Sequence, residues 1–130
     1  MANLEELTSL LWSCEITSYK FNFEDHSISL EIKRVFNNET TVFDVKLNEV
    51  CSFSWVNGMG DDRKKLYDWE YLDLVSFDTI NDTKIQIMGD SFLNQYSQAP
   101  NICLEIGNSV LLVEAKYLSI NSERFELLDN

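Results

Sequence analysis

The chain has 130 residues, 45% of them hydrophobic, and its 22 acidic against 10 basic side chains give a net charge of −12. A chain of this length buries well over half of its unfolded surface, so it can form a core without disulfides or a metal. The negative charge would repel phosphate backbones and anionic lipids, so we expect neither nucleic acid nor a membrane among its partners.

One proline and four glycines leave no candidate linker, and we expect residues 1–130 to form a single β-rich domain. The N-terminal stretch carries acids and no basic region, so it is a poor signal peptide and too short to span a membrane. Cys14, Cys51 and Cys103 are far apart and form no CxxC pair. We therefore expect buried, reduced thiols in a cytoplasmic protein.

A short helix is predicted over residues 3–12, with Asn3 as its N-cap. Its apolar stripe consists of Leu4, Leu7, Leu10 and Leu11. A hairpin follows, in which alternating apolar residues predict two strands joined by a loop over Glu24–Ser27. This loop places Phe23 opposite Ile28, Phe21 opposite Leu30, Tyr19 opposite Ile32 and Lys20 opposite Glu31.

Two further strands are predicted around Phe43–Leu47 and Cys51–Trp55, which completes a four-stranded meander. The glycines and acids of residues 57–62 then indicate an exposed loop. After it we expect a strand over Trp69–Phe77 and a short strand over Lys84–Met88. A second short helix is predicted over Ser91–Ser97, capped by Asp90.

The strongest local pattern is the stretch Ile102–Ile120, which predicts a hairpin around a type II′ turn at Gly107-Asn108. This turn pairs Ile106 with Ser109, Leu104 with Leu111 and Ile102 with Val113. The second strand is apolar on both faces, so either a bulge near Tyr117 reverses its phase or the N-terminal helix covers its other side. The tail after Glu123 either adds an edge strand or frays.

These elements predict an α+β fold, mainly antiparallel β, with about 7–8 strands, a short N-terminal helix and one further short helix. The sheet must bury its apolar face, so we expect a sandwich or a half-open barrel.

Catalytic and cofactor motifs are not evident. His26 is the only histidine and lies in a predicted loop, so it is expected to be an exposed turn residue. No phosphate-binding loop, zinc ligand set or calcium loop fits the sequence, so we predict no cofactor, no metal site and no catalytic residue. A hydrolase that uses two carboxylates stays open as an alternative, since it needs no motif.

The acidic segment, residues 57–82, is the best candidate binding surface because it combines carboxylates with aromatic residues. Such a surface would orient a basic protein through its acids and anchor it through its aromatics. The alternative is that the aromatics belong to the core and the acids to a solvated strand face, and Arg63, Lys64 and Lys65 neutralise part of the charge. The candidate partner-binding residues are Asp61, Asp62, Asp68, Trp69, Glu70, Tyr71, Asp73, Asp78 and Asp82.

The leucine-rich N-terminal helix, the hairpin ITSYKFNFEDHSISLEIK, the segment FSWVNGMG and the closing hairpin ICLEIGNSVLLVEAKYLSI resemble small acidic bacterial immunity proteins. These accompany polymorphic toxins and contact-dependent inhibition systems, and YxiG-like proteins are among them. The resemblance implies 1:1 binding to a cognate toxin domain, often a basic nuclease. It carries no binding residues over to this chain. The alternative function is a ligand-binding or regulatory β-domain with an aromatic-lined pocket.

Overall fold

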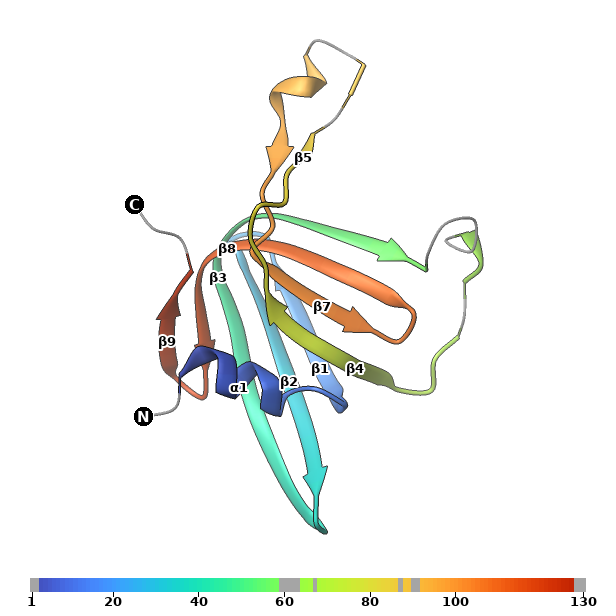
Figure 1. Ribbon diagram of the computed structural model, residues 1–130, viewed down its shortest axis with the longest axis vertical. Coiled ribbons are helices and arrows are strands. Elements are labelled where there is room, and N and C mark those ends of the chain that lie inside the picture. The colour runs from blue at the N-terminus through green and yellow to red at the C-terminus, as the bar shows by residue number, and fades with distance from the viewer. Residues whose placement is uncertain (1–2, 59–63, 67, 87, 90–91, 128–130) are drawn as a thin grey trace.

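The computed structural model describes residues 3–58, 64–66, 68–86, 88–89 and 92–127, and Figure 1 shows its ribbon. Its elements are α1 (Leu4–Leu10), β1 (Cys14–Asn22), β2 (Ser27–Phe36), β3 (Glu39–Asn57), β4 (Leu72–Thr79), β5 (Ile85–Gln86), η2 (Leu93–Gln95), β6 (Ser97–Gln98), β7 (Ile102–Ile106), β8 (Ser109–Ile120) and β9 (Glu123–Glu126). The predicted mainly antiparallel fold with a short N-terminal helix is confirmed. No helix in the described ranges is long and apolar enough to cross a membrane.

Six strands form a closed antiparallel barrel. Antiparallel ladders join β1 to β2, β2 to β3, β3 to β8, β8 to β7, β7 to β4, and β4 back to β1. Each of these strands contributes buried apolar side chains to one core. β9 pairs with the end of β8, so the tail adds the edge strand that was one of its two predicted outcomes. β5 and β6 form a separate two-stranded arm that projects from the barrel (Figure 1).

The prediction of a second helix over Ser91–Ser97 is wrong, because the described part of that region forms only the 3-10 turn η2. Tyr96 already has extended backbone angles, and Ser97 and Gln98 return along the arm to pair with β5. The proposed cap, Asp90, and the first helical position, Ser91, lie outside the described residues.

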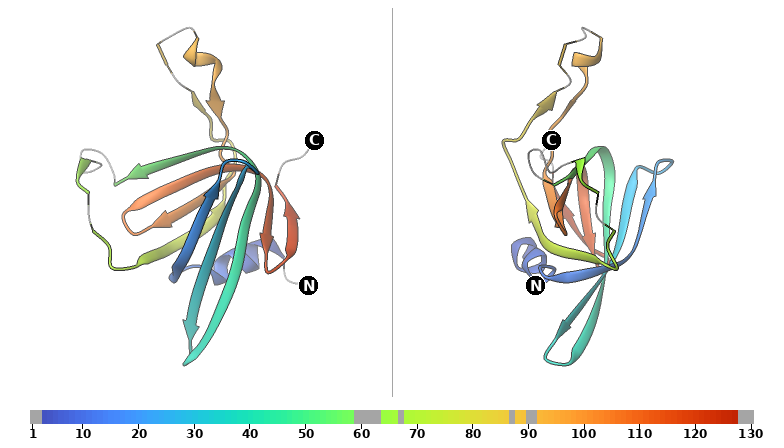
Figure 2. Two further views of the ribbon diagram at one scale, coloured as in Figure 1. Left: turned by 180° about the vertical axis from the view of Figure 1, so that it is seen from behind. Right: turned by 90° about the vertical axis from the view of Figure 1, so that its right-hand side faces the viewer.

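The N-terminal helix is capped as predicted, since the Asn3 side chain accepts a hydrogen bond of 2.8 Å from the Glu6 amide. Leu11 is fully buried, and Leu4 and Leu7 pack against the core, whereas Leu10 is 40% exposed. The helix packs mainly against β4, beside which it lies in Figure 2. The expectation that it covers the outer face of β8 is therefore wrong.

The β7–β8 hairpin has the predicted register, with Leu104 opposite Leu111 and Ile102 opposite Val113. Gly107 has φ 58°, as the first position of a type II′ turn requires. Further along β8, buried Ala115 and buried Leu118 are three residues apart, so the inward face reverses between them. β8 pairs with three strands, β7, β3 and β9, which places it at the centre of the fold.

The β1–β2 hairpin differs from its predicted register by two residues, with Phe21 opposite Ile28 and Tyr19 opposite Leu30. The cause is the Asn22 side chain, whose oxygen accepts hydrogen bonds from the amides of Glu24 and Asp25 and so starts the turn earlier. The loop therefore covers Phe23 to His26, and Lys20 lies opposite Ser29 instead of Glu31.

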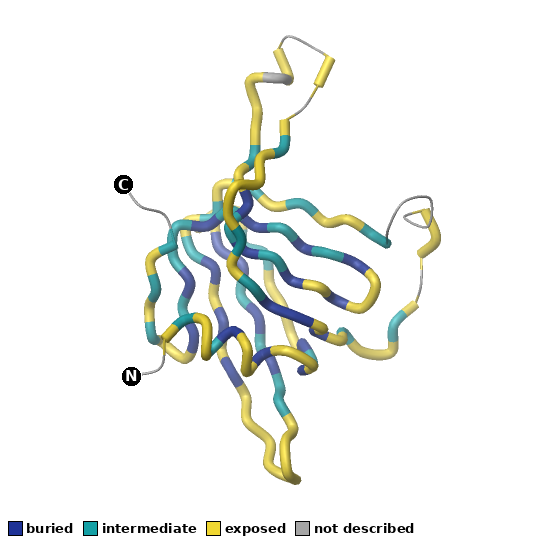
Figure 3. The backbone as a smooth tube through the Cα atoms, in the orientation of Figure 1, coloured by how far each residue is buried: buried dark blue, intermediate teal, exposed yellow. Residues whose placement is uncertain are grey.

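The third and fourth predicted strands are one long strand, β3. It bends at Glu49, which has φ 50°, and its register shifts around Cys51. Before the bend β3 pairs with β2, and from Val45 to Asn57 it pairs with β8, so the bend carries the sheet around the barrel. Figure 3 shows that the outer ends of the β2–β3 hairpin and of the arm are exposed, while the barrel strands hold the buried residues.

Candidate functional site

The shortest ladder of the barrel joins β1 to β4, and we call it the seam. Only three residue pairs join β1 to β4, and the last of them is Ile16 with Leu72. β4 begins at Leu72 while β1 continues to Asn22, so the inward side chains of Tyr19 and Phe21 have no β4 partner across from them. An apolar hollow of about 350 Å³ opens here, and side chains of all six barrel strands line it.

Aromatic side chains form the rim of this hollow, which we call the barrel mouth. Phe21 and Phe53 meet edge to face with ring centroids 5.1 Å apart, and Trp55 and Trp69 do so at 6.2 Å. Tyr19 is 63% exposed and Trp55 is 50% exposed, although both lie on the inward face of their strands. The mouth is therefore an uncovered apolar surface continuous with the core.

The acidic segment supplies one wall of the mouth and divides into two groups. Asp68, Glu70 and Asp73 are exposed near the start of β4, beside half-buried Trp69 and exposed Tyr71. Asp78 and Asp82 lie at or beyond the other end of this strand, about 17 Å away by the rise of a strand. Asp61 and Asp62 lie outside the described residues.

The strand predicted over Trp69–Phe77 is displaced, since β4 runs from Leu72 to Thr79. A register shift around Val75 lets Leu72, Leu74 and Phe77 all face inward, which a regular alternation would not allow. Trp69 precedes the strand, and its ring folds over the turn at Gly107. Trp69 thus belongs partly to the core and partly to the mouth.

A row of charged residues crosses the outer face of the sheet beside the seam. Glu15 on β1 lies opposite Asp73 on β4 and opposite Lys33 on β2. Two carboxylates directly opposite each other repel, and Lys33 offsets that repulsion from one side only. Asp73 itself is exposed on the side away from Lys33, so the row ends in a negative charge that a basic group can reach.

At the far end of β4, burial raises the pKa of Asp78, and the nearby negative charge of Glu105 raises it further. Glu105 also accepts a hydrogen bond of 3.0 Å from the Ser76 hydroxyl. This second acidic group is part of the strand surface and is separate from the barrel mouth.

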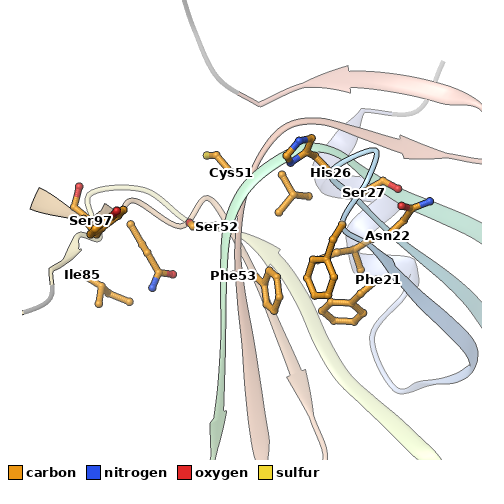
Figure 4. Close-up of a pocket in the computed structure, with 14 residues that line it drawn as sticks. Phe21, Asn22, His26, Ser27, Cys51, Ser52, Phe53, Ile85 and Ser97 are labelled. Carbon is orange, nitrogen blue, oxygen red and sulfur yellow. The ribbon is translucent and has the colours of Figure 1, made fainter. Parts of the chain in front are cut away.

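A second hollow, of about 360 Å³, lies between the β1–β2 loop, the bend of β3 and the base of the arm. Figure 4 shows its side chains, which include His26, Ser27, Cys51 and Ser52, with Ile85 and Ser97 from the arm. Phe21 and Phe53 line both hollows and so separate them. The fold thus brings together the one histidine and a thiol that are distant in sequence.

The chemistry of this second hollow does not favour a nucleophilic cysteine. Although Cys51 is exposed, partial loss of hydration raises the pKa of its thiol to about 11, and the hydrogen bond to Glu114 and its negative charge contribute to the rise. Its thiol therefore stays protonated at neutral pH, whereas the thiolate is the reactive form. His26 is exposed, with φ 56°, as predicted for a turn residue. Among the described residues, no three His, Cys, Asp or Glu side chains gather in a way that could hold a metal ion.

All three cysteines are free. Cys14 is buried and Cys103 is half-buried, but the expectation of a buried thiol is wrong for Cys51, which is exposed. The register shift at this residue explains the difference, because a bulged residue departs from the inward-facing set.

The residues that sequence reasoning missed are the aromatics of the mouth on β1 and β3: Tyr19, Phe21, Phe53 and Trp55. Their alternation correctly indicates the inward face of a strand. Whether that face is covered depends on where the pairing of β1 with β4 ends, and this is a property of the tertiary structure. No local pattern carries it.

Comparison with protein families gives a match to the model of the YxiG-like protein family over residues 4–125. A search of curated proteins gives no match. The family match includes the helix, all six barrel strands and most of β9. The chain therefore belongs to the YxiG-like protein family.

Proposed function

We propose that this protein is an immunity-type inhibitor that binds a cognate toxin domain with a basic surface in a 1:1 complex. It acts in the cytoplasm and neutralises the toxin by occupying its surface, without catalysis. Membership in the YxiG-like family supports this role, and so does the net charge of −12. Family membership is consistent with this class of function and assigns no binding surface.

The observation that carries the proposal is the juxtaposition of exposed aromatics and carboxylates beside the barrel mouth. Tyr71 is 58% exposed and Trp55 is 50% exposed, and Asp68, Glu70 and Asp73 lie along the same approach to β4. Aromatic side chains lose little conformational entropy on binding and bury a large area, so they anchor an interface. The carboxylates around them attract and orient a basic partner.

Exposed Lys64 and Lys65 flank this surface and limit its negative charge. The Asn57 side chain donates a hydrogen bond of 2.6 Å to the Lys65 carbonyl, which holds the backbone there close to the end of β3. The partner surface is therefore expected to be mixed, with its basic groups facing Asp68, Glu70 and Asp73 rather than the lysines.

The experiment co-expresses the protein with its cognate toxin domain, sought among the products of the genes beside its own. We expect a 1:1 complex and protection of the cells from the toxin. The double variant Asp68→Lys/Glu70→Lys should weaken binding by at least about tenfold, mostly through slower association.

The matched control is Glu39→Lys/Glu126→Lys, which makes the same charge change at two exposed positions away from the mouth. It should bind almost as the unmodified protein does. Equal weakening by both double variants would show that only net charge matters, and absence of any complex would overturn the proposal.

A further inference from the structure

The hollow at the barrel mouth has the features of a small-molecule site, independently of any protein partner. Its floor consists of fully formed core, since Ile16, Leu30, Ile106 and Leu111 are at most 5% exposed. Its rim consists of the half-exposed aromatics described above. The volume of about 350 Å³ lies at the small end of the range for ligand pockets in proteins.

The hollow exists because of the topology. A six-stranded barrel normally fills its interior with its own side chains. Here β4 begins at Leu72, opposite Ile16, while β1 continues, and the aromatic rings beyond that point pack edge to face in pairs around the opening. The rings remain on the rim, and the space between them stays open.

The lining sets the chemical class of the ligand. Among the residues that the structure describes, no charged side chain lines the hollow, and the polar side-chain groups there are the Tyr19 hydroxyl and the indole N–H groups of Trp55 and Trp69. A charged ligand would lose its hydration without gaining a partner. Water would find few hydrogen bonds there, and apolar cavities of this kind take up apolar molecules instead.

We propose that the barrel mouth binds a small, uncharged, mainly apolar molecule that contains an aromatic ring. The ring lies between the Phe21–Phe53 and Trp55–Trp69 pairs, where edge and face contacts with four aromatic side chains are available. One hydrogen-bond acceptor on the ligand can receive an indole N–H at the rim.

The test uses the neutral fluorescent probe N-phenyl-naphthylamine, whose emission rises in apolar surroundings. We expect 1:1 binding to the folded protein with a dissociation constant below about 100 μM. The bound probe should also quench tryptophan emission, because two of the three tryptophans lie at the mouth. A charged analogue with a sulfonate group on the ring should bind at least about tenfold more weakly.

Two substitutions locate the site. Leu72→Trp fills the hollow from the start of β4 and should abolish binding, while Trp55→Ala removes a rim contact and should weaken it about tenfold. The control is Val56→Ala on the same strand, since Val56 is 44% exposed and does not line the hollow. This variant should bind the probe as the unmodified protein does.

Circular dichroism and thermal unfolding establish that each variant is folded before binding is compared. If Leu72→Trp does not fold, Leu111→Phe serves as a second filling variant from the floor. Absence of binding by the unmodified protein would overturn the proposal. So would undiminished binding by the folded filling variants, or equal binding of the charged and neutral probes.

Discussion

Gly107, in the turn of the β7–β8 hairpin, lies against the ring of Trp69, in the segment that leads into β4. A Cβ atom at Gly107 would lie 2.9 Å from the Trp69 ring, and Gly107 has φ +58°. The glycine therefore serves both the type II′ turn and the seating of the indole. The same ring faces Trp55, so this contact connects the hairpin to the rim of the mouth.

Replacing Gly107 with alanine should destabilise the protein by about 1–3 kcal/mol, because the residue would be strained and would push against the Trp69 ring. Urea denaturation measures this change. Gly107→Asn separates the two causes, since asparagine tolerates positive φ but still carries a Cβ. If Gly107→Asn proved as stable as the unmodified protein, the Trp69 contact would contribute nothing.

Alkylation of Cys51 by iodoacetamide should be slow at pH 8, because its pKa is raised to about 11 from the ordinary thiol value of 9.0. Two pH units leave about 100-fold less thiolate than in a free thiol, and the thiolate is the nucleophile. Mass spectrometry of the labelled peptide across pH 7–11 measures the rate. Glu114→Gln removes the negative charge and should make the reaction faster, whereas Glu105→Gln should not.

The same raised pKa gives a pH dependence of stability. Between pH 9 and pH 11 the unfolded chain loses the Cys51 proton while the folded protein keeps it, so the free energy of unfolding falls as the pH rises. Urea denaturation at pH 8 and pH 10.5 should show a smaller difference for Cys51→Ser than for the unmodified protein. An equal difference in both would contradict the shifted pKa.

Asn101 anchors the base of the arm to β8. Its side chain donates a hydrogen bond of 2.8 Å to the Ala115 carbonyl and accepts one of 3.1 Å from the Ala115 amide. Asn101→Ala should cost about 2 kcal/mol, roughly 1 kcal/mol for each bond. Asn101→Asp keeps the acceptor but loses the donor. Its free energy of unfolding should therefore lie between that of Asn101→Ala and that of the unmodified protein. Thermal unfolding that left Asn101→Ala unchanged would contradict this role.

The Glu15–Asp73 pair should cost stability, since the two carboxylates face each other across the β1–β4 seam. Asp73→Asn is therefore expected to stabilise the fold by about 0.2–1 kcal/mol. The gain should shrink at high salt, which screens the repulsion. Glu126→Gln, opposite Tyr117 on β8, is the control and should change little. A destabilised Asp73→Asn variant would show that this carboxylate serves the fold.

The sequence predicts those parts of the fold that depend on residues close together in the chain. The β7–β8 register follows from Gly107 and the alternating apolar residues around it, and Asn3 caps α1 as its position indicates. The β1–β2 register is wrong by two residues, because a side chain in the turn competes with the pattern. The bend at Glu49, which joins two predicted strands into β3, has no sequence pattern that identifies it.

The candidate site was predictable only in part. The acidic segment indicates a surface rich in carboxylates and aromatics, and Asp68, Glu70 and Tyr71 are indeed exposed. Asp78 and Asp82 share that segment but lie at the opposite end of β4. The mouth itself arises where the pairing of β1 with β4 ends, so Phe53 and Trp55 join it through contacts between strands distant in sequence.

The most direct test of the proposed function is the affinity for the cognate toxin domain. Biolayer interferometry would measure it at two salt concentrations, for the unmodified protein and for Asp68→Lys/Glu70→Lys. We predict a 1:1 complex whose association slows with salt, together with a loss of at least about tenfold in the double variant. A toxin domain that does not bind, or that binds both proteins equally, would contradict the account.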